Sequence, residues 1–261
     1  MMRKQIKAIF FDIDGTLVSF KTHTVPESAR RAISLLRQQG IKVFISTGRL
    51  LKHVSAVGDI EVDGYITVNG GYCITAAGDV IFEQAIPRAT VERVLDLAQN
   101  YGFDVSVMTQ QDMYVSGMGE RVEKIAKMIG ITPTLADVRH IAATQPVVQM
   151  CPYVSVDLEQ KIMPHLPECV ASRWIETFMD LNIRGIDKSV GVRHVMDYYG
   201  LSMDNAMAFG DGGNDLPMIR DVAVGVAMGN ACDELKAVAN YITTSVDEDG
   251  VWQALKYYDL L

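Results

Sequence analysis

The chain has 261 residues, of which 49% are hydrophobic, and it carries a net charge of −8. A chain of this size can bury one large core or two smaller ones, and an acidic balance without a long basic run argues against a nucleic-acid surface. Its apolar runs are too short to span a bilayer, its N-terminus lacks the apolar segment of a signal peptide, and its four cysteines are scattered. We therefore expect a cytoplasmic enzyme or binding protein with reduced thiols and no membrane segment.

The first predicted element is a strand over residues 8–11, which stops at two carboxylates, Asp12 and Asp14. Side chains two apart in extended backbone point to the same side, so the pair can face one point unless the turn at Gly15-Thr16 rotates one of them away. In open α/β sheets, ligands bind outside the carboxyl ends of the strands. Two close carboxylates repel each other and indicate a cation or a shared proton. Taken alone, however, the pair is equally typical of an Asx turn that closes a strand.

A helix and a second strand come next. Apolar residues at helical spacing predict a helix from Pro26 to Gly40, and residues 41–45 form a buried strand that leads into Thr47. A strand–helix–strand unit of this length is a parallel crossover, so Thr47 arrives beside the two aspartates. A third strand over 65–68 ends at Asn69-Gly70-Gly71, and residues 72–82 are typical of a hairpin.

The pattern changes near residue 84. We expect one helix that ends near Gly102, and further helices over 120–129 and about 158–164. Strands are expected over 105–108, 113–116, 147–151 and 174–181. This mixture is typical of a separate α+β domain.

From about residue 184 the alternation of strands and helices resumes. Helices are expected over 188–199, 216–219 and 249–258, and another helix is expected to end at residue 239. Strands are expected over 206–209, 222–228 and 241–243. The predicted fold class is therefore α/β, with a Rossmann-like doubly wound parallel sheet built from residues 1–83 and 184–261. An α+β domain over 84–183 is inserted into it.

Several segments resemble, in order, the four motifs of the haloacid dehalogenase-like superfamily. They are residues 11–16 (FDIDGT), residues 46–49 (STGR), Lys188 and residues 210–215 (GDGGND). Residues 225–231 and 247–251 are similar to the C-terminal signature of its Cof-type, sugar-phosphatase-like branch, and the insertion resembles a cap of the C2 (C2B) type. The resemblance covers essentially the whole chain.

The resemblance implies a phosphatase that works through an aspartyl-phosphate. Asp12 would be the nucleophile, and Asp14 would protonate the leaving alcohol and then activate water. It also implies Mg2+ held by the Asp12 carboxylate, the Asp14 carbonyl and the Asp211 carboxylate, with Asp215 orienting the ligands. A turn at Asp211 followed by a helix cap at Asp215 is the alternative interpretation of the last two residues.

The phosphate group needs hydrogen-bond donors and a cation near the predicted site. Implied candidates are the Thr47 hydroxyl, the Gly48 N–H, the N–H groups of Ile13 and Asp14, the Asn214 amide and the Lys188 ammonium. Lys188 is alternatively an exposed lysine in the first turn of a helix. Arg49 fits a ligand and a solvated residue equally well.

Within the inserted domain, Arg173, Glu176 and Asp180 are candidates to face a hydroxyl-rich leaving group, or they are surface charges. The sequence thus favours a monomeric or dimeric Mg2+-dependent phosphatase of small phosphomonoesters, with sugar phosphates preferred and a small-molecule phosphate ester as its partner. A phosphotransferase or phosphomutase on the same scaffold is the first alternative, and a catalytically idle metabolite sensor is the second.

Overall fold

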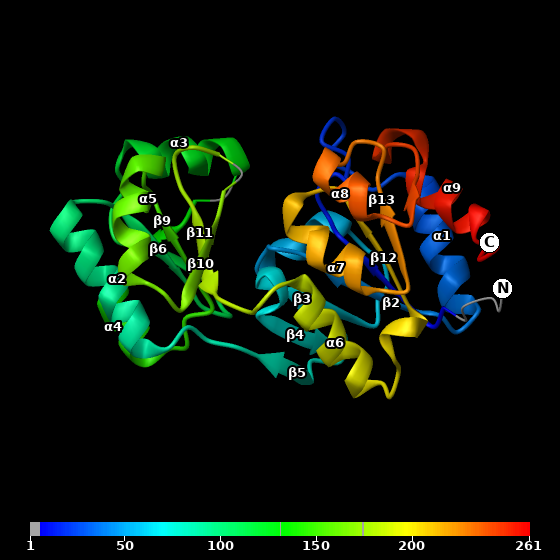
Figure 1. Ribbon diagram of the computed structural model, residues 1–261, viewed down its shortest axis with the longest axis horizontal. Coiled ribbons are helices and arrows are strands. Elements are labelled where there is room, and N and C mark those ends of the chain that lie inside the picture. Colours follow the sequence, from blue (N-terminus) through cyan, green and yellow to red (C-terminus); the bar gives the residue numbers. More distant parts are fainter. Residues whose placement is uncertain (1–5, 131, 174) are drawn as a thin grey trace. The chain divides into compact units, whose positions relative to one another are not determined.

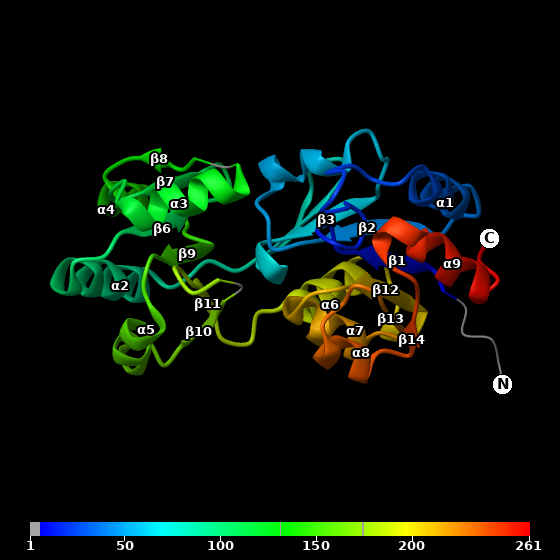
Figure 2. The ribbon, with the colours of Figure 1, turned by 90° about the horizontal axis from the view of Figure 1, so that it is seen from above.

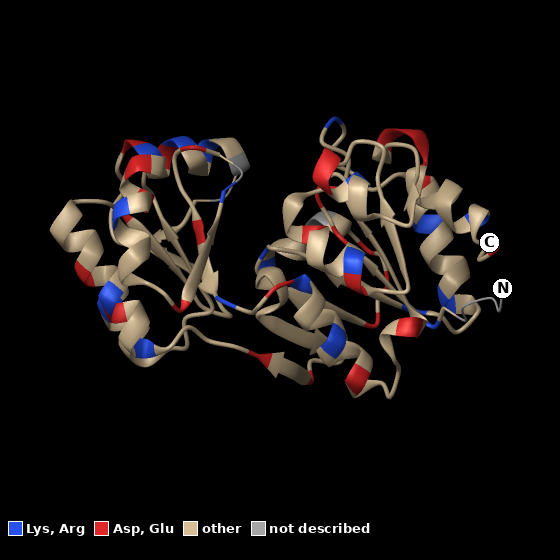
Figure 3. Ribbon diagram, in the orientation of Figure 1, with Lys and Arg blue, Asp and Glu red and all other residues tan. Residues whose placement is uncertain are grey.

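The computed structural model describes residues 6–130, 132–173 and 175–261 of the chain (Figure 1). It contains two compact units, one formed by Met1–Glu83 with Ile186–Leu261 and the other by Gln84–Gly185. Among the described residues, no helix is both long and apolar enough to cross a membrane. Figure 3 shows Lys and Arg interspersed with Asp and Glu on the helices of both units.

The first unit is built around one eight-stranded sheet in the order β14-β13-β12-β1-β2-β3-β4-β5. Neighbours from β14 to β3 are parallel, whereas β4 and β5 run antiparallel as the predicted hairpin. The strands are β1 (Ala8–Phe11), β2 (Lys42–Ser46), β3 (Gly64–Thr67), β4 (Tyr72–Thr75), β5 (Val80–Glu83), β12 (Ala206–Gly210), β13 (Val224–Ala227) and β14 (Tyr241–Ile242).

Helices cover both faces of this sheet, as the continuous apolar strands require. They are α1 (Glu27–Gln38), α6 (Lys188–Tyr198), α7 (Leu216–Asp221), α8 (Asp233–Val238) and α9 (Gly250–Tyr257). Alternate residues of β1 separate the two cores, because Ile9 and Phe11 pack with residues of α1 and α9 while Phe10 packs with residues of α6, α7 and α8. Figure 2 shows the two sets of helices on opposite faces. The predicted α/β fold class is confirmed.

The second unit has a six-stranded sheet in the order β10-β11-β9-β6-β7-β8 and one main apolar core. Its strands are β6 (Val105–Met108), β7 (Met113–Val115), β8 (Thr134–Leu135), β9 (Gln149–Pro152), β10 (Cys169–Ser172) and β11 (Asp180–Ile183). Its helices are α2 (Arg88–Tyr101), α3 (Glu120–Ile129), α4 (Val138–Thr144) and α5 (Val156–Ile162). This is the predicted α+β mixture, although β8, β10 and α4 were not expected.

The predicted strand over 174–181 is wrong. The described residues show β10 and β11 as an antiparallel pair in which Cys169 lies opposite Ile183, and the chain turns between them; residue 174 itself lies outside the described residues. Arg173 holds this turn, since its guanidinium donates to the carbonyl oxygens of Val154, Glu176 and Phe178 at 2.9–3.0 Å. The segment between β10 and β11 is therefore a turn in which the Glu176 and Phe178 carbonyl groups bind the guanidinium of Arg173.

Candidate active site

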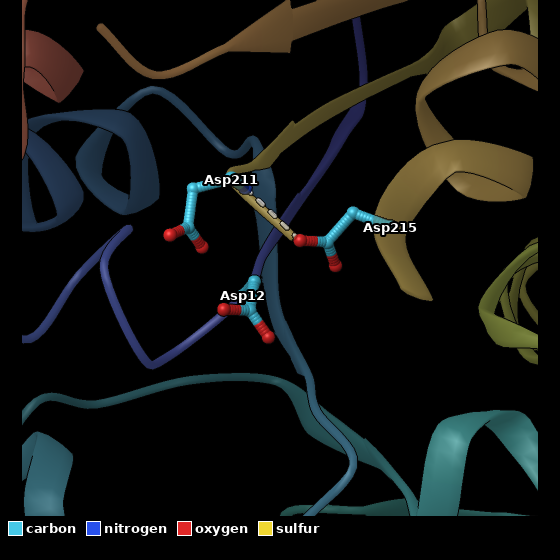
Figure 4. Close-up of side chains that lie close together, drawn as sticks. All are labelled: Asp12, Asp211 and Asp215. Atoms are coloured by element: carbon cyan, nitrogen blue, oxygen red, sulfur yellow. Dashed lines mark hydrogen bonds between the residues drawn. The ribbon is translucent and has the colours of Figure 1, made fainter. Parts of the chain in front are cut away.

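Three aspartates meet at the carboxyl edge of the first unit's sheet. Asp12 directly follows β1 and Asp211 directly follows β12, and these two strands are parallel neighbours. Asp215 lies in the short helical turn Gly213–Asp215, just before α7. One carboxylate oxygen from each lies within 4.8 Å of the other two, and Figure 4 shows the three side chains gathered around one point.

A buried lysine joins two of these aspartates. Lys188 opens α6, where the Asp187 carboxylate accepts a hydrogen bond from Val190 N–H as the helix cap. The Lys188 side chain has no exposed surface, and its Nζ lies 2.6 Å from Asp12 Oδ1 and 2.5 Å from Asp215 Oδ1. Burial alone would lower the pKa of Lys188, but attraction to these two carboxylates raises it overall. The exposed-lysine interpretation is thus wrong, and the ammonium stays charged.

Asp215 both closes its own turn and binds the lysine. Its Oδ2 accepts hydrogen bonds from the N–H groups of Asp211 and Gly212, each at 3.0 Å, while Oδ1 accepts from Lys188. The side chain makes no capping bond to α7, so the helix cap of the alternative interpretation is absent although the turn is present. Because its two oxygens have separate partners, the Asp215 carboxylate is held in one orientation.

Asp211 is the aspartate of the cluster that does not pair with Lys188. Burial, followed by repulsion from Asp215, raises its pKa to about 7. The Thr16 hydroxyl and the Asn230 amide donate to it at 3.3 Å each. Gly15 has a φ of +81° and a Cβ there would lie 2.1 Å from Asp211 Oδ2, so only glycine fits beside this carboxylate.

Asp14 does not join the cluster. The turn after Asp12 places Leu17 and Val18 N–H on Ile13 O, at 3.0 and 2.7 Å, and this rotates Asp14 away from the other aspartates. Its carboxylate instead accepts from Arg49 Nε at 2.8 Å and from Nη2 at 2.5 Å. The sequence left the role of Arg49 open; the structure pairs it with Asp14 in a two-bond ion pair.

Backbone donors surround the end of β1 and β2. Across residues 6–130, 132–173 and 175–261, the N–H groups of Ile13, Asp14 and Gly48 find no acceptor. Thr47 is buried, and its hydroxyl oxygen accepts from Arg49 N–H at 3.1 Å, so its own proton is free to be donated. The predicted phosphate-binding positions at these strand ends therefore offer donors that the fold itself does not use. The 3₁₀ helix Leu51–Val57 follows Thr47-Gly48.

Two asparagines that the sequence left without a role connect these loops. Asn230 donates to Gly15 O at 2.8 Å and accepts from Val246 N–H at 3.0 Å, so it links three loops around Asp211. Asn69 accepts from the Asn214 amide at 3.0 Å. Two sequence features could have identified these residues. Asn230 lies in the C-terminal signature, and Asn69 lies at the end of the third predicted strand.

The three candidates of the second unit have different surroundings. Asp180 accepts from Gln149 Nε2 at 2.7 Å and from Cys151 Sγ at 3.3 Å, and burial raises its pKa. Arg173 is engaged by the turn that it holds, and its Nε also donates to Glu159. Glu176 is exposed. Arg173 donates to the backbone carbonyl of Glu176, but among the described residues no hydrogen bond joins the side chains of the three candidates to one another, and their substrate-facing role stays a prediction.

The predicted magnesium ligands fit a hard cation. Asp12 and Asp211 present carboxylate oxygens at one point, and Asp211 has two weak hydrogen bonds but a strongly raised pKa. A buried carboxylate of this kind gains from a divalent cation, and oxygen ligands are those that Mg2+ prefers. Donor chemistry and burial therefore agree with a magnesium site here.

Comparison with known proteins bears directly on this cluster. A family model described as haloacid dehalogenase-like hydrolase matches residues 9–255. Among curated proteins, the chain is 33% identical to "Putative phosphatase YkrA" of Bacillus subtilis over 98% of both chains. It is 29% identical to the 5-amino-6-(5-phospho-D-ribitylamino)uracil phosphatase YitU of the same organism, over 96% of both.

Solved structures give the same picture. The phosphatase BT1666 from Bacteroides thetaiotaomicron superposes with a TM-score of 0.94 at 35% identity, covering 100% of this chain and 97% of its own. The HAD subclass IIB sugar phosphatase BT4131 superposes with a TM-score of 0.86 at 35% identity, covering 98% of this chain and 100% of its own.

Proposed function

The chain belongs to the haloacid dehalogenase-like hydrolases and is a phosphoric monoester hydrolase, and from that premise we propose that it is a cytoplasmic, Mg2+-dependent phosphatase of sugar phosphates that works through an aspartyl-phosphate on Asp12. The observation that carries the mechanism is the buried Lys188 between Asp12 and Asp215, with Asp211 in the same cluster. This arrangement supplies a fixed carboxylate and a fixed positive charge at the same point.

In the proposed first step, an Asp12 oxygen attacks phosphorus while the bond to the ester oxygen breaks, and the leaving alkoxide takes a proton from Asp14. In the second step Asp14 removes a proton from water, which attacks the acyl phosphate, releases inorganic phosphate and restores the Asp12 carboxylate. Arg49 binds the Asp14 carboxylate in this structure. The acid–base role therefore requires that ion pair to open when substrate enters.

The charged phosphoryl oxygens are proposed to bind the unused backbone donors. Those of Ile13 and Gly48 lie at the ends of adjacent strands, and the Thr47 hydroxyl and the Asn214 amide would add side-chain donors. Lys188 would offset negative charge on Asp12 and on the transition state. Preorganised donors of this kind supply a large part of the rate acceleration in phosphoryl and acyl transfer.

The magnesium ion would be held by the Asp12 and Asp211 carboxylates and the Asp14 carbonyl oxygen, with Asp215 orienting the loop that carries Asp211. When bound, it supplies positive charge that lets a phosphate dianion approach three carboxylates. The raised pKa of Asp211 is the feature of this chain that fits such a cation.

Metal binding should consequently compete with a proton on Asp211. Its folded pKa of about 7 lies above the unfolded value of 3.8, so the metal-free protein loses stability as pH rises between these values. Mg2+ requires the deprotonated form, and below pH 7 its apparent affinity should fall about tenfold per pH unit. The stabilisation by Mg2+ over EDTA, measured as a shift in Tm, should be larger at about pH 8 than at about pH 6. Equal shifts at both values, or an undiminished shift in Asp211→Asn, would contradict this.

A hydroxyl-rich leaving group is favoured by the relatives. One solved neighbour is a sugar phosphatase, and one curated relative acts on a ribityl phosphate, which is also polyhydroxylated. We propose that the unit Gln84–Gly185 acts as the cap that selects the leaving group. Asp180 is its first candidate because hydrogen bonds from Gln149 Nε2 and Cys151 Sγ hold that carboxylate in place.

A substrate screen with Mg2+, ranked by kcat/KM, tests this choice. We expect hexose or pentose phosphates to exceed nucleotides and glycerol phosphates by about tenfold or more. A requirement for a sugar bisphosphate, or an isomerised sugar phosphate as product, would show a phosphomutase instead. A ribitylaminouracil phosphate that leads the ranking would replace the sugar preference while leaving the phosphatase activity intact.

A further inference from the structure

The segment that follows β3 has an unfavourable backbone. Val68, Asn69 and Gly70 have φ angles of 53°, 51° and 97° in succession. Positive φ is uncommon for residues other than glycine, and for a β-branched residue such as valine it is a genuine outlier. Val68 is also buried, with 2% of its surface exposed. Such outliers persist where the surrounding structure holds them, and they are frequent at functional sites.

Two neighbouring segments hold this backbone in place. Val68 N–H donates to Arg49 O and Asn69 N–H donates to Thr47 O, both at 3.1 Å. Gly70 packs against the residue before Lys188, because a Cβ on Gly70 would lie 2.0 Å from Asp187 O. The turn is therefore clamped between the loop after β2 and the start of α6, which carry Thr47 and Lys188 respectively.

The Asn69 side chain lies among the proposed phosphate-binding residues. Its Oδ1 accepts a hydrogen bond from Asn214 Nδ2 at 3.0 Å. Its amide also covers Gly48, since a Cβ placed on Gly48 would be 3.0 Å from Asn69 Oδ1 and 3.2 Å from Nδ2. Asn69 thus contacts Thr47 through its backbone, Gly48 by packing and Asn214 by a hydrogen bond, although Asn214 is 145 residues away in the chain.

We infer that Asn69 is a positioning residue for the phosphate site, an inference that rests on the proposed function. Its carboxamide fixes the orientation of the Asn214 amide and packs against the Thr47-Gly48 loop. Hydrogen-bond donors from two distant segments are therefore already in place when the phosphoryl group arrives. Asparagine suits the position because it tolerates left-handed backbone better than other side-chain-bearing residues do. It also accepts the hydrogen bond without adding negative charge beside a phosphate dianion, as aspartate would.

Three variants separate this role from a merely structural one. Asn69→Gly keeps the left-handed backbone and removes the side chain, Asn69→Asp keeps shape and acceptor but adds charge, and Asn214→Ala removes the partner. Asp249→Gly is the matched control, because Asp249 also has a positive φ, of 58°, and its carboxylate bonds Ser28 away from the Asp12 cluster. Each would be assayed for kcat and KM on the best sugar phosphate, for inorganic phosphate affinity by calorimetry, and for Tm.

We expect Asn69→Gly to weaken phosphate binding and raise KM by about tenfold, the factor that one ordinary hydrogen bond supplies, with Tm close to that of the parent. Asn69→Asp should weaken phosphate binding more than Asn69→Gly does, whereas a structural role would tolerate the isosteric change. Effects of Asn69→Gly and Asn214→Ala should be far less than additive. Phosphate affinity and KM within about twofold of the parent in Asn69→Gly, or full additivity with Asn214→Ala, would overturn the inference.

The proposed function has its own readout, which is the activity of Asp12→Asn. Retained turnover in that variant would refute the aspartyl-phosphate mechanism. The calorimetric phosphate affinities of the Asn69 variants would still test the positioning role, because they do not depend on turnover. The two failures are thereby distinguishable.

Discussion

Replacing Asp12 with asparagine is expected to lower kcat/KM by a factor on the order of 10⁴ or more, as removal of a catalytic nucleophile typically does. A carboxamide is a poor nucleophile, and it cannot form the acyl phosphate through which the reaction is proposed to pass. The measurement is phosphate release from the best sugar phosphate, together with mass spectrometry of the quenched enzyme, which should detect a phosphorylated peptide in the parent but not in the variant.

The Asp12→Asn variant should remain folded. Its amide oxygen can still accept from Lys188 Nζ, and Lys188 keeps its ion pair with Asp215. Asp221→Asn is a matched control in the same unit, because Asp221 pairs with Arg193 and Ser189 at the surface of α6 and α7. The control should keep activity within about twofold of the parent. Activity of Asp12→Asn within tenfold of the parent would refute the assignment of the nucleophile.

The parallel core could be predicted because its signals are local. Apolar strands of four or five residues, helices at 3.6-residue spacing and the short turns between them define β1, α1 and β2 before any long-range contact is known. Parallel crossovers then place the ends of these strands at one edge. That is why Asp12, Thr47 and Asp211 could be expected to meet from the sequence.

The orientation of individual side chains could not be predicted in the same way. Whether Asp14 faces the cluster depends on hydrogen bonds that Leu17 and Val18 make to Ile13 O, and on Arg49, which lies 35 residues further along the chain. The contact between Asn69 and Asn214 is likewise decided by tertiary packing. Spacing within a motif predicts which residues come near one another, but it does not predict which of them form hydrogen bonds or ion pairs.

The short elements of the second unit were the least predictable. β8 has two residues, and its place is set by parallel pairing with β7 and not by its own pattern. The apolar residues after Arg173 satisfied a strand pattern, yet the guanidinium of Arg173 binds the carbonyl groups there and makes a turn the better solution. Hydrogen bonds from one arginine side chain to backbone carbonyl groups produce no periodic pattern in the sequence.

Replacing Lys188 with methionine should produce the largest combined loss of activity and stability. Lys188 is fully buried between Asp12 and Asp215, so the change leaves two carboxylates without their cation. Breaking a buried ion pair in this way typically costs about 3–5 kcal/mol of unfolding free energy. Loss of the fixed charge at the reacting group should also lower kcat/KM by at least about 10²–10³-fold.

The pH dependence of this destabilisation has a definite sign. Burial already raises the pKa of Asp12, and Lys188 is the group that lowers it. Without the ammonium, the folded protein binds more protons than the unfolded chain above pH 4, so stability of the variant rises as pH falls. The deficit in Tm relative to the parent, measured in EDTA, should therefore be smaller at about pH 5 than at about pH 8. A deficit that grows on acidification would contradict this account.

A double variant separates the two losses. Lys188→Met combined with Asp215→Asn removes a buried charge of each sign, and neutralising a buried pair is often close to neutral for stability. The double variant should therefore regain a substantial part of the unfolding free energy lost by Lys188→Met, while its kcat/KM stays low because the cation beside Asp12 is still missing. Lys42→Met is the matched control, since Lys42 pairs with Asp63 at a half-buried position and its loss should cost about 1 kcal/mol or less. Recovery of activity together with stability would mean that Lys188 serves the fold alone.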